Sequence, residues 1–315
     1  MWRLLSVLFG CTIMMPVHAV IHGEPMPIEQ VSTGQIHIEQ LKWYGGTNTQ
    51  VTEQDECSSV VVGTHPLTVL TVSHCLRDSK IHPITRTPVV KIFLGRPVPA
   101  IRAALYNRFN EVENNLAADL AVLIFDGDAP EGIEAIPVLS SLNASQALVC
   151  GYGRGIDDRK IDNPRCAVKP LLSAEEDFYQ FVPEFYEQLD PLLHLQFRAQ
   201  FLAKHAMVSS SSALLAVSRV QNERYQFDLP MPTRGDSGGP WIVNLNNGQQ
   251  GVIALTSFVE TFYRKNKQWP FFNENRAPLM DFPYAAFGVR LDTVEAQALF
   301  NRARLEGADI HMLSE

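Results

Sequence analysis

Hydrophobic residues along most of this chain occur in short runs that are separated by turn residues. This pattern predicts an all-β protein, because strands are short and turns favour Gly, Pro, Asn and Asp. Residues 58–62 and 67–72, with Gly63-Thr64-His65-Pro66 between them, are predicted to form a hairpin. Further strands are predicted at 89–94, 121–125, 147–151, 241–243 and 252–258, the last two joined by a turn at Asn246-Asn247-Gly248.

Two segments have a helical pattern instead. Residues 292–306 place their apolar side chains on one broad face, with Asp292 and Glu295 as a capping box. The apolar side chains of this face are Val294, Ala298, Leu299, Ala303 and Leu305. A second segment, from Ser173 to about Met207, contains two prolines and is predicted to form several short helices. Its aromatic residues, Phe178, Tyr179, Phe181, Phe185 and Tyr186, either pack in a core or line a partner surface.

The first nineteen residues have the pattern of a secretory signal peptide. A short basic start is followed by an apolar run from Leu4 to Met15, which is too short to span a bilayer, and then by the small residue Ala19. Cys11 could mark a lipoprotein instead, but the bulky Phe9 and the short run before it disfavour lipidation. We therefore expect a secreted or periplasmic chain that begins at Val20 and is not held in a membrane.

Composition narrows the function classes. The chain has 315 residues, 46% hydrophobic and 19% charged, with a formal charge of −8, so nothing in it indicates nucleic-acid binding. Its length allows one large domain or two smaller ones. No CxxC or HExxH sequence is present, and we expect neither a metal nor another cofactor. Without Cys11, four cysteines remain in an oxidising compartment, and three pairings or free thiols are possible.

The stretch TRGDSGGP, residues 233–240, is a candidate functional loop with two interpretations. Its glycines predict a turn, and Arg234-Gly235-Asp236 matches an integrin-binding tripeptide, so an adhesive loop is one interpretation. The other is a nucleophilic Ser237. A serine hydroxyl needs a base and an acid that orients this base. His74 ends a predicted strand in TVSHC, and Asp119 precedes a predicted strand in ADLAVL, so these residue types are available if the fold unites them.

In the chain order His74, Asp119, Ser237, these three motifs resemble the trypsin and chymotrypsin family of serine proteases. TVSHC is similar to the family's TAAHC, ADLAVL to its DIALL, and GDSGGP matches without interruption. The resemblance implies an all-β fold of two antiparallel six-stranded β-barrels with a C-terminal helix and a partly helical insertion. It implies barrels at about 20–135 and 136–315 and an insertion at about 167–228.

The resemblance also assigns roles. His74 is the general base, Asp119 orients it, Ser237 attacks the carbonyl of a peptide substrate, and the N–H groups of Gly235 and Ser237 form the oxyanion hole. Asp236 is expected to be buried and paired with a new N-terminal ammonium. Because Val20-Ile21-His22-Gly23 resembles the family's Ile-Val-Gly-Gly start, leader removal itself is expected to supply this ammonium.

A bridge between Cys57 and Cys75 matches the family. Cys150 precedes Gly151-Tyr152-Gly153, which resembles the family's Gly-Trp-Gly, and a bridge from Cys150 to Cys166 is feasible.

The specificity pocket departs from the trypsin pattern. Met231 replaces the acid that binds Lys or Arg, so cleavage after small or medium apolar residues is expected. Ser257 and Val259 are expected in one wall and Gly288 in the other, unless Ala254 is the aligned residue. The intervals 166–231 and 260–286 are longer than is usual in the family. Three roles are open for them: restricting the access of substrate chains to the cleft, binding a partner, or elaborating the surface without a function. A trypsin-fold protein that binds without cleaving is the alternative function.

Overall fold

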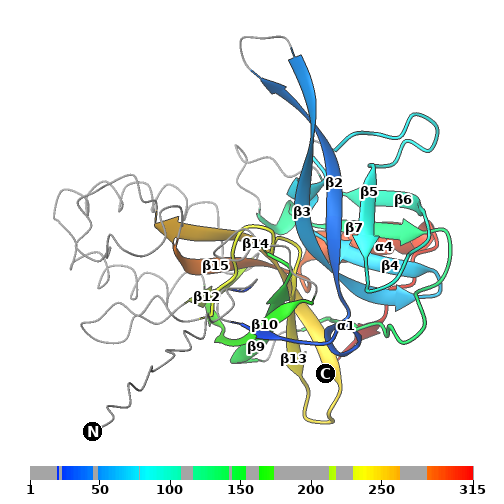
Figure 1. Cartoon of the computed structure of the whole chain (residues 1–315). Coiled ribbons are helices and arrows are strands. Elements are labelled where there is room, and N and C mark those ends of the chain that lie inside the picture. The colour runs from blue at the N-terminus through cyan, green and yellow to red at the C-terminus, as the bar shows by residue number, and fades with distance from the viewer. Residues whose placement is uncertain are drawn as a thin grey trace, which may run out of the picture.

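A computed structural model describes residues 20, 23–44, 49–77, 79–107, 116–141, 144–153, 163–173, 213–217, 230–262 and 282–314. Within them, strands dominate and form two sheets that lie side by side, with a C-terminal helix (Figure 1). The all-β, trypsin-like architecture expected from the sequence is therefore confirmed.

The first sheet has six antiparallel strands in the order β5-β2-β3-β4-β7-β6. Their bounds are β2 (Thr33–Tyr44), β3 (Thr49–Thr64), β4 (Leu67–Thr71), β5 (Val90–Phe93), β6 (Ile101–Tyr106) and β7 (Ala121–Phe125). All residues of β4 and β7 are buried, which explains why both strands are continuous apolar runs. The predicted hairpin is confirmed, since Val60 of β3 lies opposite Leu70 of β4.

The hairpin of β2 and β3 was not predicted, and of its two strands only residues 58–62 of β3 were expected. The two strands pair from Thr33 with Val60 to Tyr44 with Thr49, and the hairpin projects beyond the rest of the sheet (Figure 1). The sequence of β2 is mostly polar, and Ile36 and Ile38 are the residues that bury apolar side chains in its described part. Two apolar positions are too few for a clear period-two signal.

The second sheet has ten strands among the described residues. Six form its central part: β9 (Gln146–Gly151), β10 (Arg165–Pro170), β12 (Ala213–Val217), β13 (Pro240–Asn244), β14 (Gln250–Phe262) and β15 (Phe282–Arg290). Four two-residue strands extend it: β1 (Glu24–Pro25), β8 (Val138–Leu139), β11 (Leu172–Ser173) and β16 (Met312–Leu313). The predicted turn at 246–248 joins β13 and β14, with Gly248 at φ 81°. Ser173, the expected start of several short helices, instead ends β11, and the rest of the expected helices with their aromatic residues, 174–207, lie outside the described residues.

The C-terminal helix α4 (Val294–Leu305) is present, but its predicted cap and apolar face were partly wrong. Thr293 caps it by accepting a hydrogen bond from Ala296 N, whereas Asp292 pairs with Arg290. Val294, Ala298 and Leu305 are exposed, because the helix buries the side of Ala296, Leu299, Phe300 and Ala303. The other helices among the described residues are the short α1 (Ile28–Val31), η1 (Ser73–Cys75) and η2 (Leu116–Ala118). None of the described helices has the length and apolarity needed to cross a membrane.

The described residues contain two disulfides, Cys57 to Cys75 and Cys150 to Cys166. The first joins β3 to η1, and the second joins directly opposite positions of β9 and β10. Both predicted pairings are thereby confirmed. Bridges of this kind persist in oxidising compartments.

Candidate active site

His74 and Asp119 meet because β4 and β7 are neighbours in the first sheet. Thr71, the last residue of β4, lies opposite Ala121, the first residue of β7. His74 in η1 and Asp119 after η2 therefore lie at the same edge of the sheet. His74 Nδ1 is 2.8 Å from Asp119 Oδ2, and His74 N donates to Asp119 Oδ1 at 2.9 Å.

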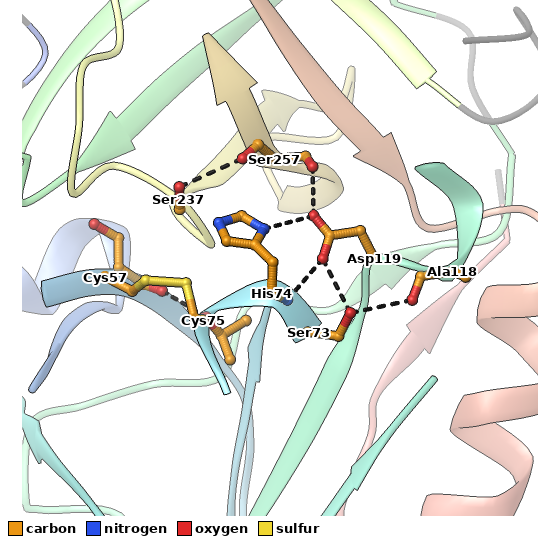
Figure 2. Close-up of polar contacts among 10 residues, drawn as sticks. Cys57, Ser73, His74, Cys75, Ala118, Asp119, Ser237 and Ser257 are labelled. Atoms are coloured by element: carbon orange, nitrogen blue, oxygen red, sulfur yellow. Dashed lines mark hydrogen bonds and ion pairs between the residues drawn. A yellow bond between two sulfur atoms is a disulfide. The ribbon is translucent and has the colours of Figure 1, made fainter. Parts of the chain in front are cut away.

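The Asp119 carboxylate is fully buried, but donors surround it (Figure 2). Besides the two from His74, the hydroxyl of Ser73 donates to Oδ1 at 3.0 Å, and the hydroxyl of Ser257 donates to Oδ2. Buried charges are tolerated only when they are paired and hydrogen-bonded. The four contacts therefore explain how this carboxylate can stay ionised inside the protein. Sequence reasoning placed Ser257 in a pocket wall and assigned nothing to Ser73.

Burial and charge act in opposite directions on this pair. Burial alone lowers the pKa of His74, but the charge of Asp119 and its hydrogen bond outweigh burial and hold that pKa above its ordinary 6.5. Burial alone raises the pKa of Asp119, whereas the charge and hydrogen bonds of His74, with Ser257, keep it below 3.8. The raised pKa of His74 and the lowered pKa of Asp119 both mean that the proton is favoured on the imidazole rather than on the carboxylate.

Ser237 lies on the other side of the imidazole ring, so that the ring separates it from Asp119 (Figure 2). Its carbonyl accepts from Ser58 N at 2.7 Å, and its hydroxyl donates to Ser257 O at 3.4 Å. Because Nδ1 of neutral His74 carries the proton donated to Asp119, Nε2 is the acceptor nitrogen. The three residues predicted from separate motifs are thus brought together.

The loop that carries Ser237 needs glycine for its conformation. Gly235 and Gly238 have φ values of 95° and 85°, which other residues rarely adopt. A side chain on Gly238 would also collide, since a Cβ there would lie 2.2 Å from Ser58 O. Within the described part of the chain, the N–H groups of Gly235 and Ser237 donate to no acceptor. They are available to a bound oxyanion.

Asp236 is fully buried, so the adhesive interpretation of the Arg-Gly-Asp sequence is wrong. Its carboxylate accepts from Gly153 N at 2.6 Å, Thr233 N at 2.7 Å and Val20 N at 3.3 Å. A Cβ on Gly151 or Gly153 would lie within 2.5 Å of a carboxylate oxygen of Asp236, which explains both glycines. Burial raises the pKa of Asp236 to about 6 despite the three donors.

The start of the described chain is held beside this carboxylate. Val20 is fully buried, Gly23 N donates to Val20 O, and Arg165 Nη1 donates to Gly23 O, both at 2.5 Å. Strand β1 continues the attachment by pairing Glu24 with Cys166. Sequence reasoning missed Arg165, because a single arginine carries no local signal for a contact across 142 positions.

The residues predicted for the specificity pocket have different environments. Met231 and Val259 contact one apolar cluster that includes the buried Trp241. Gly288 lies against the Trp241 indole, which a Cβ at this position would approach to 2.9 Å. Ser257 directs its hydroxyl to Asp119 rather than to the cluster. Ala254, the alternative wall residue, is a member of the cluster.

A lysine next to this cluster was not predicted. Lys169 is buried, and its Nζ donates to Pro230 O, beside Met231, at 2.7 Å. Burial lowers its pKa to about 8. Elsewhere in the described residues, no group of three His, Cys, Asp or Glu side chains is arranged to hold a metal ion.

Comparison with known proteins supports the fold. No family model and no curated protein sequence matches the chain. Among solved structures, it is similar to the scabies mite inactivated protease paralogue S-D1, with a TM-score of 0.51 and 11% sequence identity. The match covers 92% of this chain and 98% of that one. The trypsin-like fold is therefore present, although hardly any sequence similarity accompanies it.

The pair of His74 and Asp119 makes a prediction about proton binding. In Asp119→Asn the pKa of His74 should fall below 6.5, because burial then acts without the opposing carboxylate. NMR titration of the imidazole measures this directly. Asp128→Asn is the matched control, since Asp128 pairs with the exposed His65 and should leave the titration of His74 unchanged. An unchanged pKa in Asp119→Asn would contradict the assignment.

Proposed function

We propose that this chain is a serine endopeptidase that hydrolyses peptide bonds through an acyl-enzyme. The observation that carries the proposal is the contact of a buried, fully hydrogen-bonded Asp119 with His74, whose ring faces Ser237 on its other side. If these polar side chains had met by chance on the protein surface, the carboxylate of Asp119 would be exposed to solvent, but it is fully buried. Here four donors hold it beneath the imidazole.

In the proposed reaction, Ser237 Oγ attacks the carbonyl carbon of the scissile bond while His74 Nε2 takes its proton. Asp119 stabilises the imidazolium that forms. The tetrahedral oxyanion accepts from the free N–H groups of Gly235 and Ser237, and losing one such donor typically costs about 3 to 4 kcal/mol. His74 then protonates the leaving amine, and water hydrolyses the acyl-enzyme with His74 again as base.

A non-cleaving, binding function is the second candidate, and two observations favour it. One solved structure that this chain resembles is described as an inactivated protease paralogue, and Ser237 Oγ donates to Ser257 O rather than to His74. The second observation is weak, because hydrogen bonds between catalytic groups are often long or misaligned before substrate binds. Retention of His74, Asp119, Ser237 and Gly235 favours the active enzyme.

A fluorophosphonate probe distinguishes the two functions. It should label Ser237 in the wild-type protein that begins at Val20, and Ser237→Ala should abolish labelling, because only an activated hydroxyl attacks phosphorus at a useful rate. Ser140→Ala removes an exposed hydroxyl that donates to Leu313 O and should label like wild type. A wild-type protein that folds but does not react would identify the binding function instead.

We also propose cleavage after small or medium apolar residues such as Ala, Val or Leu. Met231 offers no charge partner to a basic side chain, and the nearby Lys169 ammonium adds repulsion. Burying an unpaired cation is costly, so selectivity over Lys or Arg of about a hundredfold or more in kcat/KM is expected. A peptide library measures this. A profile dominated by cleavage after Lys or Arg would exclude the proposed pocket.

Activation is proposed to follow from removal of residues 1–19, which leaves a protease domain of residues 20–315. Asp236 is buried, and the described residues supply N–H groups but no cation to it. Cleavage before Val20 would turn the Val20 nitrogen, 3.3 Å from Asp236 Oδ2, into an ammonium. Export would then produce the active form without a separate activating protease.

This proposal predicts different behaviour for chains that start at Ala19 and at Val20. The Ala19 form should fold but lose activity by about a hundredfold or more, since Asp236 has no counter-ion to hold the oxyanion loop. In the folded Ala19 form, burial raises the pKa of Asp236 from its ordinary 3.8 to about 6, so the folded state keeps this proton to a higher pH than the unfolded chain does. Its stability should therefore fall as pH rises from about 4 to 6, by roughly 3 kcal/mol.

Chemical denaturation of both forms across this pH range measures the effect. In the Val20 form the ammonium favours the ionised carboxylate, so this loss of stability should be much smaller. Asp236→Asn in the Ala19 form is the control, because it removes the titrating group. Equal activity of the Ala19 and Val20 forms would contradict the mechanism.

A further inference from the structure

Ser58 lies where the two sheets meet. It follows Cys57 in β3 of the first sheet and is fully buried. Three of its hydrogen bonds reach segments next to the second sheet, namely the loop before β13 and the residue after β9. Its N–H donates to Ser237 O at 2.7 Å, its hydroxyl donates to Gly235 O at 2.9 Å, and the same hydroxyl accepts from Tyr152 N at 2.8 Å.

The direction of these bonds is fixed by chemistry. A hydroxyl has one proton, and a backbone N–H can only donate. Because Tyr152 N already donates to Ser58 Oγ, the hydroxyl proton is left for the Gly235 carbonyl. Both peptide groups are deep in the protein, so without this hydroxyl a buried donor and a buried acceptor would lose their partner.

Ser58 is itself held in place. Its carbonyl accepts from Thr71 Oγ1 at 2.9 Å, and Gly238 packs so closely that a Cβ on it would be 2.2 Å from the same carbonyl. Cys57, the preceding residue, is bound to Cys75. Ser58 therefore has little freedom to follow the loop if the loop moves, and it acts as a fixed point of attachment.

The contacts of Ser58 flank the groups that would bind an oxyanion. Gly235 and Ser237 each contribute a free N–H, and Ser58 binds the carbonyl of both residues. With both carbonyls bound to one rigid residue, rotation of the intervening peptides is restricted. The third contact, Tyr152, lies between the two glycines that enclose Asp236, so the same hydroxyl also joins the loop to the end of β9.

We propose that the hydroxyl of Ser58 is a positioning group for the oxyanion loop: it holds Gly235 so that the N–H groups of Gly235 and Ser237 stay directed at the substrate. Ser58 touches no reacting atom and acts through the loop. The inference rests on the proposed serine protease function, which it deepens by adding a residue from the first sheet to the catalytic apparatus.

Ser59 provides a matched control. It is the next residue of β3, is also fully buried, and its hydroxyl donates to a backbone carbonyl, Gly34 O, at 3.1 Å. That carbonyl belongs to β2 of the same sheet, away from the loop. Ser58→Ala and Ser59→Ala therefore remove a hydroxyl from equally buried positions. Only Ser58→Ala removes a hydrogen bond to Gly235.

The experiment compares kcat and KM of both variants on an apolar peptide substrate, together with thermal unfolding. Both variants should lower the unfolding midpoint, and Ser58→Ala should lower it more, because two buried groups rather than one lose their partner. Ser58→Ala should lower kcat by about tenfold to a hundredfold with KM changed by less than about threefold, because the lost alignment acts in the transition state. Ser59→Ala should keep kcat within about twofold. Equal kcat values for the two variants, whether both are reduced or both retained, would overturn the proposal.

A second measurement separates this inference from the protease function itself. Amide hydrogen exchange at Tyr152 N–H, measured in the Ser237→Ala background, does not depend on activity. It should be faster with Ser58→Ala than with Ser59→Ala, and unchanged exchange would overturn the inference. If Ser58→Ala does not fold, Ser58→Gly removes the same hydroxyl and is held to the same criteria. Failure of the fluorophosphonate probe to label the wild type would reject the protease function, while the exchange result still decides the Ser58 contact.

Discussion

Two carboxylates are buried where the sheets meet, and neither can remain charged without donors brought to it from distant parts of the chain. Asp119 receives its hydrogen bonds from His74, Ser73 and Ser257. Asp236 receives them from backbone N–H groups near the start of the chain, at the end of β9 and in its own loop. Solvating these two groups therefore forces both sheets and the N-terminal segment into one arrangement.

The two carboxylates are solvated in different ways, and this difference separates their roles. Asp119 faces hydroxyls and an imidazole that can itself become charged, so its environment lowers its pKa and raises that of His74. Among the described residues, Asp236 accepts hydrogen bonds only from neutral peptide groups, and burial raises its pKa to about 6. Asp119 therefore has a partner that can carry a positive charge, whereas no described residue supplies a positive charge to Asp236.

The sequence allowed the fold class and the three central residues to be predicted, because His74, Asp119 and Ser237 each lie in a short motif next to a clear apolar strand. Ser58, Ser73, Arg165 and Lys169 could not be assigned, because their roles depend on partners that the tertiary fold supplies. The same reason explains the errors in α4. Its local pattern gave an apolar stripe, but the packing of the adjacent sheet decided that Ala296 and Phe300, rather than Val294 and Leu305, are buried.

The disulfide between Cys57 and Cys75 joins the immediate neighbours of two functional positions. Cys57 precedes Ser58, which holds the loop, and Cys75 follows His74. A single covalent link therefore sets the spacing between His74, the proposed general base, and Ser58, the proposed anchor of the oxyanion loop. While the bridge is open, as in a reducing compartment, that spacing depends on noncovalent packing alone. Oxidation of these two cysteines would thus align both halves of the proposed site in one chemical step.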